Sequence, residues 1–521
     1  MPALHLGPLD SSILIGYLVL LAAIGWWAGR HNVNTADDYF LASRSIPWVV
    51  TAMSFAVSCI SAITFIGTPA EGFAADYRYL LSNPGDIVAT LFIAFVFLPH
   101  FQKLRVTSIY EAVAARLGGE VRTTCSAYFL LTRTMASTVR IVAIAKVLEV
   151  VTGGALSYSN CVILVVGGVL TYTVIGGGRA IAWTDTVQFA LFVIGAGAAL
   201  TFIINNVPGG IPTIIEQGRH ALKPDGSIYN KFNFLEMYKP ENIGLMLLMM
   251  VWAFFNSSAV YGTDQDMVQR LLACNNNRGA RWSLLAWGLF GIPIVFTFLS
   301  IGVSLYAYSQ FHPEFIAGMT DPDHVFPRFI LSSMPEGLRG LLLAAIVSAA
   351  MGSADSALAS LATSFTVDFY KPFWGRNAGE AQCVRVSKLS VIGFGVLFVF
   401  FALWMRGLDR LLWLAFRLIA FTYGPLLGVF AVAIMTDWRI PSRKLIALML
   451  STTLIFFGLA MSAWWMTTHG GSAFWVQLHK TYWRLYIIFG PLIVAGGAYL
   501  MSEREGAGAI AQPALGRPTS P

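Results

Sequence analysis

The sequence predicts an all-α integral membrane protein with about thirteen transmembrane helices. Of its 521 residues, 56% are hydrophobic and only 12% are charged, whereas about 25% are charged in an ordinary soluble domain. Apolar stretches of about 18 to 25 residues recur along the whole chain, and each can cross the roughly 30 Å hydrocarbon layer as a helix. The alternating ten-residue pattern of an outer-membrane barrel is absent from the sequence. Helices are therefore the expected spanning form, because they satisfy their own backbone hydrogen bonds in lipid.

The apolar stretches follow one another with short polar connections. They lie at residues 12–29, 47–68, 84–100, 127–151, 158–175, 184–205, 243–266, 283–307, 339–366, 387–405, 411–435, 445–465 and 483–501. The first ends in WWAGRHN and not in a small-residue cleavage site, so we interpret it as a span and not as a signal peptide. We expect one membrane domain over residues 1–502 and a disordered cytoplasmic tail over 503–521, which is rich in Gly, Ala and Pro.

Lys and Arg are shared unequally between alternate connections. With the N-terminus outside, the inside connections hold nineteen of them, Arg270 included, and the outside connections hold eleven. Cytoplasmic connections collect basic residues, so we expect the N-terminus outside and the C-terminus inside, in the plasma membrane (the inner membrane of a bacterium). The same bias accounts for the net charge of +7 without a nucleic-acid partner. The five scattered cysteines indicate neither a metal site nor a disulfide framework.

Polar interruptions occur in two stretches that are five spans apart. The stretch TAMSFAVSCISAITFIGTPAEGF carries hydroxyls, Gly67 and Pro69, and the stretch WAFFNSSAVYGTDQDMVQR carries Asn256, Gly262 and Asp264. Transporters are often built from inverted repeats whose corresponding helices break near the bilayer midplane. The pair therefore suggests such a repeat.

The ninth apolar stretch carries a stripe of small and hydroxyl residues. Ala349, Gly352, Ser353, Ser356 and Ser360 recur at helical spacing. Small residues also let membrane helices pack closely, which is the alternative explanation. Asp355 favours a site, since a midspan acid costs about 2.5 to 3.5 kcal/mol on insertion scales and should face a cavity or a cation. A second acid, Asp185, follows a glycine turn; there, helix-dipole stabilisation is the alternative.

Three long motifs resemble those of the sodium/solute symporter family. They are GGGRAIAWTDTVQ (176–188), YGTDQDMVQRLL (261–272) and MGSADSALASLATSFTVDFY (351–370). The resemblance covers residues 12 to about 500. It implies a LeuT-type fold of five plus five inverted helices, with core repeats over about 47–205 and 243–435.

The resemblance also implies one or two coupled sodium ions. For a first ion it implies the carbonyls of Val57, Ile60 and Ala349 and the hydroxyl of Ser353. Where relatives commonly have two adjacent hydroxyls, this chain has Gly352 and Ser353. The missing oxygen is replaced by water or a carbonyl, or the site binds sodium weakly. For a second ion the resemblance implies a deeper set: Asp185, Asp355, Ser356 and Ser353. Protons are an alternative coupling ion.

Basic residues inside the spans suggest an acidic solute. Arg133 and Arg140 lie two turns apart on the fourth span, and Arg417 lies on the eleventh. Pairing with buried acids, or snorkelling, is the alternative for the first two. Arginine suits a bidentate carboxylate clamp. Relatives that carry sialic acid use a fourth-span arginine, and the resemblance implies that Arg133 is the closer positional match. The remaining expected substrate contacts come from the two interrupted helices: Ser61, Thr64, Asn256, Ser257 and Tyr261.

The predicted function is sodium-coupled import of a small organic acid, such as a sialic or sugar acid. A sugar, polyol or vitamin symporter of the same family is one alternative, and a solute sensor or a channel is another. We do not expect an enzyme, because the eight His residues all fall in loops or span ends and leave no Ser–His pair for nucleophilic catalysis. Expected partners are the solute, sodium and lipid, with no obligatory protein partner.

Overall fold

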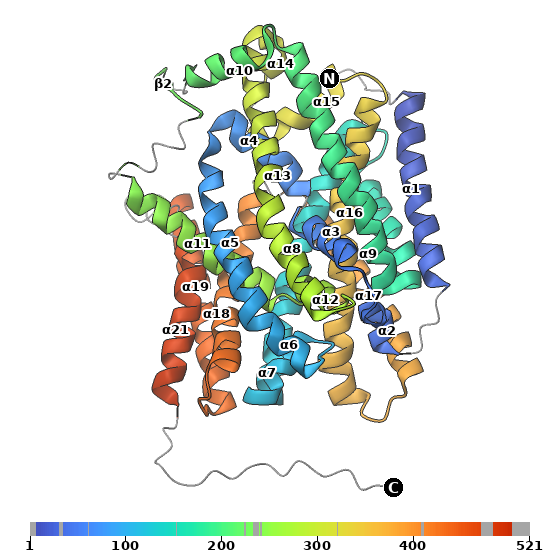
Figure 1. Ribbon diagram of the computed structural model, residues 1–521, viewed down its shortest axis with the longest axis vertical. Helices are drawn as coiled ribbons and strands as arrows, with labels where there is room; N and C mark the ends of the chain where they lie inside the picture. Colours follow the sequence, from blue (N-terminus) through green and yellow to red (C-terminus); the bar gives the residue numbers. More distant parts are fainter. Residues whose placement is uncertain are drawn as a thin grey trace.

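Nearly all described residues of the computed structural model are helical, and most helices run along its long axis (Figure 1). The two short strands, β1 (Ala221–Leu222) and β2 (Ile228–Tyr229), pair antiparallel in the connection after α9. The structure describes residues 7–30, 35–60, 62–152, 154–222, 226–232, 239, 242–319, 321–407, 411–469 and 483–502.

The helices begin and end as follows. The α-helices are α1 (Pro8–Gly29), α2 (Ala36–Leu41), α3 (Trp48–Cys59), α4 (Ala62–Ala74), α5 (Asn83–Phe92), α6 (Leu98–Leu104), α7 (Ile109–Leu117), α8 (Gly119–Val151), α9 (Tyr158–Asn206), α10 (Gly210–Arg219), α11 (Ile243–Thr263), α12 (Gln265–Leu272), α13 (Asn277–Phe311), α14 (Pro313–Ile316), α15 (Val325–Ser333), α16 (Leu338–Ser364), α17 (Glu380–Trp404), α18 (Leu411–Met435), α19 (Ser442–His469) and α21 (Tyr486–Met501). Tighter or wider turns are η1 (Ala42–Arg44), η2 (Tyr77–Ser82), η3 (Ile93–Phe97), η5 (Pro322–His324), η6 (Phe365–Trp374) and η7 (Trp483–Leu485).

The predicted membrane helices are present. Within the described ranges, nine helices are long and apolar enough to span a membrane, or ten if the bent pair Trp48–Cys59 and Thr64–Ala74 counts as one span. Every apolar stretch expected from the sequence overlaps a helix. Two of them, 158–175 and 184–205, both fall in α9, where the backbone turns at Gly177 (φ 54°). The all-helical membrane fold is confirmed, and the count of thirteen spans stays a prediction.

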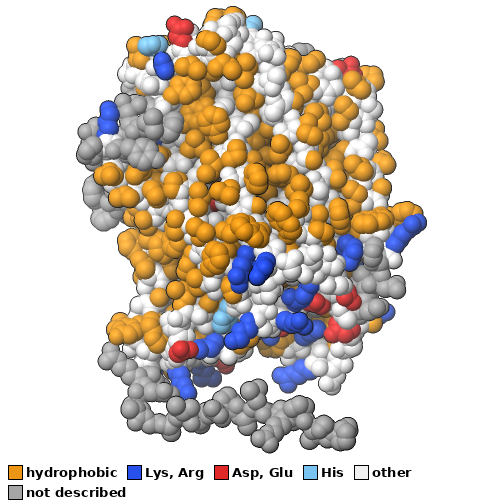
Figure 2. All heavy atoms as spheres, viewed as in Figure 1, with side chains coloured by type: hydrophobic (Ala, Val, Ile, Leu, Met, Phe, Trp, Pro, Cys, Tyr) orange, Lys and Arg blue, Asp and Glu red, His pale blue; other side chains and the backbone are white. Residues whose placement is uncertain are grey.

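The surface divides into an apolar belt and a basic end. Figure 2 shows hydrophobic side chains over the middle of the visible face and most of the visible Lys and Arg below them. In Figure 1, α1 begins at the upper end, and α21 ends at the lower end, the one with these basic side chains. The belt fits a bilayer whose normal follows the long axis of the molecule.

Two spans are interrupted by single extended residues. Ile60 (φ −89°, ψ 118°) follows α3, and the chain bends by 58° before α4 continues. Asp264 (φ −91°, ψ 118°) separates α11 from α12 in nearly the same conformation. Both breaks fall in the stretches whose polar residues predicted an interruption. They free backbone groups that a continuous helix would use, which membrane proteins tolerate where a cavity or protein surrounds them.

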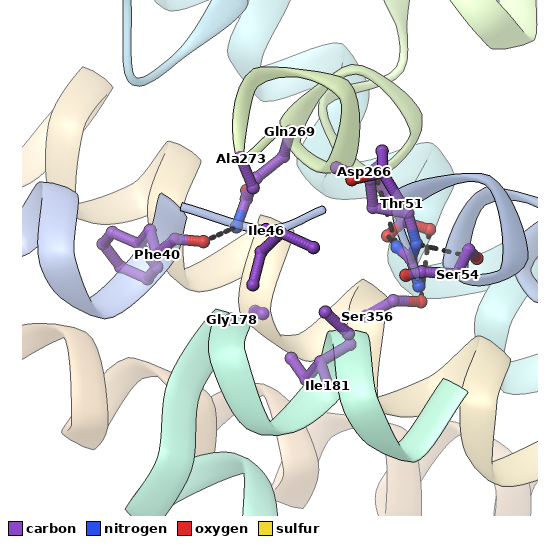
Figure 3. A pocket seen from close by; sticks show the side chains of 13 residues that line it. Phe40, Ile46, Thr51, Ser54, Gly178, Ile181, Asp266, Gln269, Ala273 and Ser356 are labelled. Atoms are coloured by element: carbon purple, nitrogen blue, oxygen red, sulfur yellow. Dashed lines mark hydrogen bonds and ion pairs between the residues drawn. The ribbon is translucent and has the colours of Figure 1, made fainter. Parts of the chain in front are cut away.

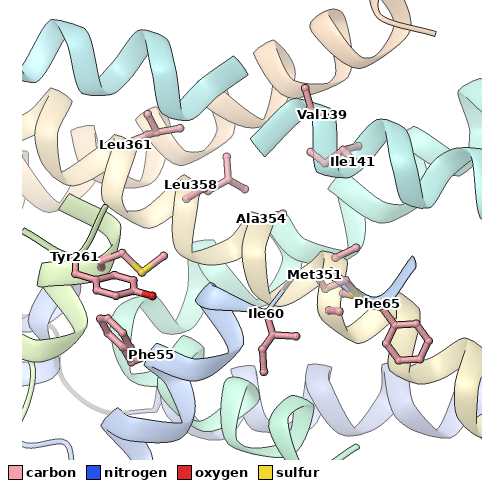
Figure 4. Close-up of a cluster of buried hydrophobic side chains, with 14 of the residues drawn as sticks. Phe55, Ile60, Phe65, Val139, Ile141, Tyr261, Met351, Ala354, Leu358 and Leu361 are labelled. Atoms are coloured by element: carbon pink, nitrogen blue, oxygen red, sulfur yellow. The ribbon is translucent and has the colours of Figure 1, made fainter. Parts of the chain in front are cut away.

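Helix α16 forms the centre of the molecule. From Leu342 to Ser364 every side chain is buried, and the helix packs against α9, α8, α1 and α17. Figure 4 shows Met351, Ala354 and Leu358 of α16 among side chains of α8 and the Ile60 break. The small residues predicted from the sequence allow this close packing. The polar stripe of α16 is therefore held inside protein, away from lipid.

Helices α4 and α13 touch backbone to backbone through two glycines. A Cβ on Gly72 would lie 2.3 Å from the Leu299 carbonyl oxygen, and one on Gly302 would lie 2.0 Å from that of Pro69. Any side chain at either position would collide with main-chain atoms. The outer half of the first interrupted span is thus fixed against α13.

The last turn of α4 is held by a buried lysine. The Lys231 ammonium donates to the carbonyl oxygens of Gly72 (3.3 Å), Phe73 (2.7 Å) and Ala75 (2.8 Å) and to the Tyr229 hydroxyl (2.9 Å). These contacts satisfy carbonyls that a helix end leaves without partners. Burial lowers the pKa of Lys231 to about 7, although nearby Asp76 opposes the shift.

Candidate substrate and ion sites

A cavity of about 200 Å³ lies at the two helix breaks. Its walls come from α3, α4, α5, α8, α11, α13 and α18. The cavity is lined by six residues that the sequence predicted as substrate contacts: Thr64, Arg133, Arg140, Asn256, Ser257 and Tyr261. Ser61 lies outside the described residues. Arg417 lies in the first turns of α18, and its side chain lies outside the described part.

One end of the cavity carries a carboxylate. Asp86, at the start of α5, accepts hydrogen bonds from the hydroxyls of Ser257 and Tyr261 (2.9 Å), and the Trp287 indole N–H donates to the Tyr261 hydroxyl (2.7 Å). Both hydroxyls bond to Oδ1. The structure places the Asp86 side chain at the cavity, between two predicted contact residues.

The two arginines of α8 have different surroundings. Arg133 is 3% exposed and forms ion pairs with Asp264 (3.1 Å) and Asp266. Arg140 has no ion-pair partner among the described residues, and its Nη1 is buried without a hydrogen bond. Arg133 therefore pairs with buried acids, which is one of the alternatives that the sequence left open for the two arginines. Arg140 thus lines the cavity with one guanidinium nitrogen that has no partner.

A buried network of charges connects the cavity wall to α9. Asp264 also accepts from the Tyr423 hydroxyl (2.9 Å), and Asp266 pairs with Arg270 (2.8 Å). Arg270 pairs with Asp185 (3.1 Å), which accepts a further bond from the Ser54 hydroxyl (2.5 Å). The network therefore links the second interrupted span to α3 and to the predicted ion-binding acid of α9.

A small cavity adjoins this network on the side of α16. It measures about 30 Å³, enough for a water molecule or a bare alkali ion. Figure 3 shows Thr51, Ser54 and Asp266 together on one side of it, with Ser356 facing them from α16. The Ser356 hydroxyl lies 3.4 Å from an Asp266 carboxylate oxygen and 3.0 Å from the Gly352 carbonyl oxygen. Oδ1 of Asp185 is buried without a donor.

Asp355 has a different environment from Asp185. One of its oxygens accepts from the Tyr172 hydroxyl of α9 (2.7 Å), and the other accepts from the Ser356 backbone N–H (2.5 Å). No arginine or lysine forms an ion pair with Asp355 in the described part of the chain. Its carboxylate is thus buried and held by hydrogen bonds, with no direct ion pair among the described residues.

The predicted first sodium site lies where α3 meets α16. Val57 is close to Gly352, since a Cβ on Gly352 would lie 2.5 Å from Val57 Cγ1. Ile60 is the extended residue at the break, and its carbonyl is outside the α3 helix. The Ser353 hydroxyl donates to the Ala350 carbonyl (3.0 Å), which leaves the hydroxyl oxygen with lone pairs for a cation. Ala349 is buried one turn earlier on the same face.

The space beside Gly352 is occupied by an amide that the sequence did not single out. A Cβ on Gly352 would lie 2.2 Å from Oε1 of Gln188, from α9. Gln188 is 1% exposed, and neither of its amide atoms has a hydrogen-bond partner. The Tyr17 and Ser348 hydroxyls are neighbours of this amide, and neither forms a hydrogen bond of normal geometry. Gln188, Tyr17 and Ser348 thus form a buried polar cluster next to Gly352.

The motifs of the sequence have a family counterpart. The family model described as "Sodium:solute symporter family" matches residues 39–450. This chain belongs to the sodium:solute symporter family. The resemblance expected from the three motifs is thereby confirmed.

Two relatives of this symporter cover most of its length. The sodium/sialic acid symporter SiaT of Proteus mirabilis is 27% identical over 430 residues, 82% of this chain and 85% of SiaT. The human sodium-coupled monocarboxylate transporter 1 is 28% identical over 464 residues, 87% of this chain and 72% of that protein. Both names describe sodium-coupled transport.

A solved structure shares the fold of this symporter. The outward-open, substrate-bound state of a Na⁺-coupled sialic acid symporter superposes with a TM-score of 0.81 and 23% sequence identity, over 95% of this chain and 99% of the other. The chain is thus a multi-pass transporter of the plasma membrane that couples solute movement to sodium.

The sequence analysis did not identify the roles of Arg270 and its partner Asp266 in the charge network of this symporter, or the role of Gln188. The orientation count placed Arg270 in an inside connection, but it is 8% exposed and lies in α12. That assignment was wrong, because TDQDMVQR continues as a helix inside the protein. The spacing of Asp266 and Arg270, one turn apart, was a signal for an ion pair. For Gln188 the only signal was its place in the first motif, three residues after the acid Asp185 and hence about one helical turn from it.

Proposed function

We propose that this symporter imports a small organic solute that carries a carboxylate, such as a sialic or sugar acid. The observation that carries the proposal is the Arg140 guanidinium, which lines the cavity at the helix breaks with a buried nitrogen that has no partner. A buried cation without a counter-ion is costly, and a planar guanidinium suits a carboxylate. Relatives named for sialic acid and for monocarboxylates agree with an acidic solute.

Uptake by the purified protein in proteoliposomes tests this proposal. Sialic acid, gluconate, lactate, glucose, inositol and biotin are supplied outside, under an inward sodium gradient and, separately, under potassium, lithium or proton gradients. We expect concentrative uptake of a carboxylate with sodium and its loss in Arg140→Gln. Accumulation of sugars or polyols alone would contradict the acidic substrate. Downhill leak without accumulation would indicate a channel, and binding without flux a sensor.

We propose that the first sodium ion lies between α3 and α16. Its oxygens are the carbonyls of Val57, Ile60 and Ala349 and the hydroxyl of Ser353. Oε1 of Gln188 takes the place of the hydroxyl that Gly352 lacks. Its closeness to Gly352 and its missing partners support this role. Sodium binds oxygen ligands, and an amide oxygen is as suitable a neutral donor as a hydroxyl.

We propose that a second sodium ion lies deeper, beside the small cavity. Asp185 contributes its unpartnered Oδ1, and Ser356, Ser353 and Asp355 are the nearby oxygens of α16. Local charge supports a second cation: Asp185 has a single ion-pair partner, Arg270, which it shares with Asp266, and Asp355 adds a further carboxylate that forms no ion pair in the described part of the chain.

We propose five plus five inverted helices for the core, with the N-terminus outside and the C-terminus inside. The nearly equal backbone angles of Ile60 and Asp264 support corresponding breaks in the two repeats. The basic lower end, where α21 ends, supports a cytoplasmic C-terminus. Cysteine labelling of intact cells at Arg78 and Arg116, both exposed and each replaced by Cys, distinguishes the two orientations, since only position 78 is then reached from outside.

A further inference from the structure

The charged groups of the large cavity indicate more about the solute than that it is an acid. Four ionisable carboxylates and guanidiniums line it: Asp86, Arg133, Arg140 and Asp264. Arg133 and Asp264 pair with each other at 3.1 Å. Asp86 and Arg140 form no ion pair with each other or with any other described residue. The cavity therefore contains one unpaired charge of each sign.

These two unpaired charges line the same cavity. Asp86 comes from α5 and Arg140 from α8, and Cys59, at the end of α3, lines the cavity with them. A solute in this cavity can therefore contact both a carboxylate and a guanidinium.

Asp86 is prepared to receive a cation. The hydroxyls of Ser257 and Tyr261 both donate to Oδ1, and Oδ2 has no donor in the described part of the chain. Hydroxyl bonds hold the carboxylate in place without neutralising it. Asp86 and Arg140 are both partly buried, so each loses some hydration and has no counter-ion to offset that loss.

Aromatic rings surround the Asp86 end. Tyr79, Trp252, Tyr261 and Trp287 all line the cavity, and Tyr79 lies within electrostatic reach of Asp86. Aromatic faces attract ammonium groups, by about 0.5 to 2 kcal/mol each. A carboxylate beside several rings is a common arrangement for binding an ammonium group.

We propose that the solute is a small zwitterion, whose carboxylate binds Arg140 and whose ammonium group binds Asp86. The proposal rests on the proposed function and narrows its substrate class from organic acids to amino acids and their N-methylated forms. A simple acid would neutralise Arg140 and leave Asp86 uncompensated. A zwitterion satisfies both and brings no net charge into the bilayer. The volume of about 200 Å³ is below the about 300 to 1,000 Å³ of sites for drug-sized ligands, which also favours a small solute.

A homologous series of ligands tests the proposal with the wild-type protein alone. Binding in sodium is measured by thermal shift for glycine, β-alanine, γ-aminobutyrate and 5-aminovalerate, because the chain length sets the distance between the two charges. Each is compared with the acid that lacks the amine (acetate to valerate) and with the amine that lacks the acid. The N-trimethyl form of the best zwitterion is then added. We expect one zwitterion to bind at least tenfold more tightly than both of its matched fragments.

Variants extend the same test. Asp86→Asn should lower the affinity for the best zwitterion at least tenfold and remove its advantage over the deaminated acid. Asp437→Asn, at an exposed ion pair with Arg116, is the matched control and should leave both affinities unchanged. Deaminated acids that bind as tightly as the zwitterions would overturn the inference, as would an equal loss for both classes in Asp86→Asn.

The outcomes separate this inference from the proposed function. If sialic acid or lactate is accumulated with sodium and no zwitterion binds, the inference fails and the acid symporter remains. If no carboxylate of either kind is accumulated, the proposed function fails and the inference fails with it.

Discussion

Oε1 of Gln188 lies 2.2 Å from where a Cβ at Gly352 would be, so the amide and a side chain at position 352 compete for one space. The glycine is thus explained by its neighbour. Two adjacent hydroxyls, as relatives commonly have, would not fit against this amide without displacing it. Positions 188 and 352 should therefore be interpreted together, because they supply one oxygen ligand between them.

Substitutions at Gly352 and Gln188 should have non-additive effects on the sodium dependence of uptake. Gly352→Ser should displace the amide, and Gln188→Ala should remove an oxygen, so each change alone should raise the sodium concentration for half-maximal uptake about tenfold, or about 1.4 kcal/mol. The double variant has the serine hydroxyl and the space for it, and should lie closer to wild type than either single variant. Uptake as a function of sodium measures this. Additive losses would show that the two positions do not share one role.

The acid of α9 should determine both stability and coupling. Asp185→Asn breaks the ion pair with Arg270 inside the protein, where loss of one partner costs about 3 to 5 kcal/mol. We expect a lower melting temperature in detergent and uptake that no longer responds to sodium. Ser353→Ala tests the first site in the same assay without breaking an ion pair. Unchanged sodium dependence in both variants would show that the ion sites are misplaced.

The two arginines of α8 should respond in opposite ways to removal of their charge. Arg133→Met leaves Asp264 and Asp266 buried with less compensation and should destabilise the protein by about 3 to 5 kcal/mol. Arg140→Met removes a charge that has no counter-ion, so stability should be unchanged or should rise, while the affinity for carboxylates should fall. Melting temperatures and ligand titrations on the same samples measure both effects. Equal destabilisation by the two variants would contradict the difference in pairing.

Lys231 predicts a pH dependence of stability near neutrality. Burial lowers its pKa from the ordinary value of 10.5 to about 7, so between these pH values the unfolded chain binds a proton that the folded chain does not. The free energy of unfolding should therefore rise as the pH increases from 7 towards 10, by at most about 1.4 kcal/mol per pH unit. It should not change through this group below pH 7.

Comparison with Lys231→Met isolates that contribution. The difference in melting temperature between wild type and variant should grow in favour of wild type from pH 7 to pH 9. Asp76 and Tyr229, the ionisable groups that face Lys231, are present in both proteins. A difference that stays constant over this range would mean that the folded lysine titrates normally.

Local patterns in the sequence predicted the helices and both interruptions. Apolar length defines a span, and the hydroxyls before Ile60 and the polar run around Asp264 mark where a helix is unfavourable in lipid. The buried stripe of α16 followed from the same kind of pattern. These features depend on residues that are neighbours along the chain.

Pairings between distant segments could not be predicted in this way. Arg133 had two readings until the positions of Asp264 and Asp266 were known, and Arg270 looked like a loop residue because its partner Asp185 is 85 positions away. Gln188 has meaning only beside Gly352, on another helix. Such roles arise from three-dimensional contact and leave no periodic trace in one sequence.

The glycine contact between α4 and α13 limits how the cavity can open. Gly72 and Gly302 bring the two main chains so close that neither helix can slide along the other without collision. The outer half of the first interrupted span and the long helix beside it should then rotate as one rigid body, with the joint at the extended residue Ile60. A covalent tether between these two helices should leave transport intact, while a tether across the joint should stop it.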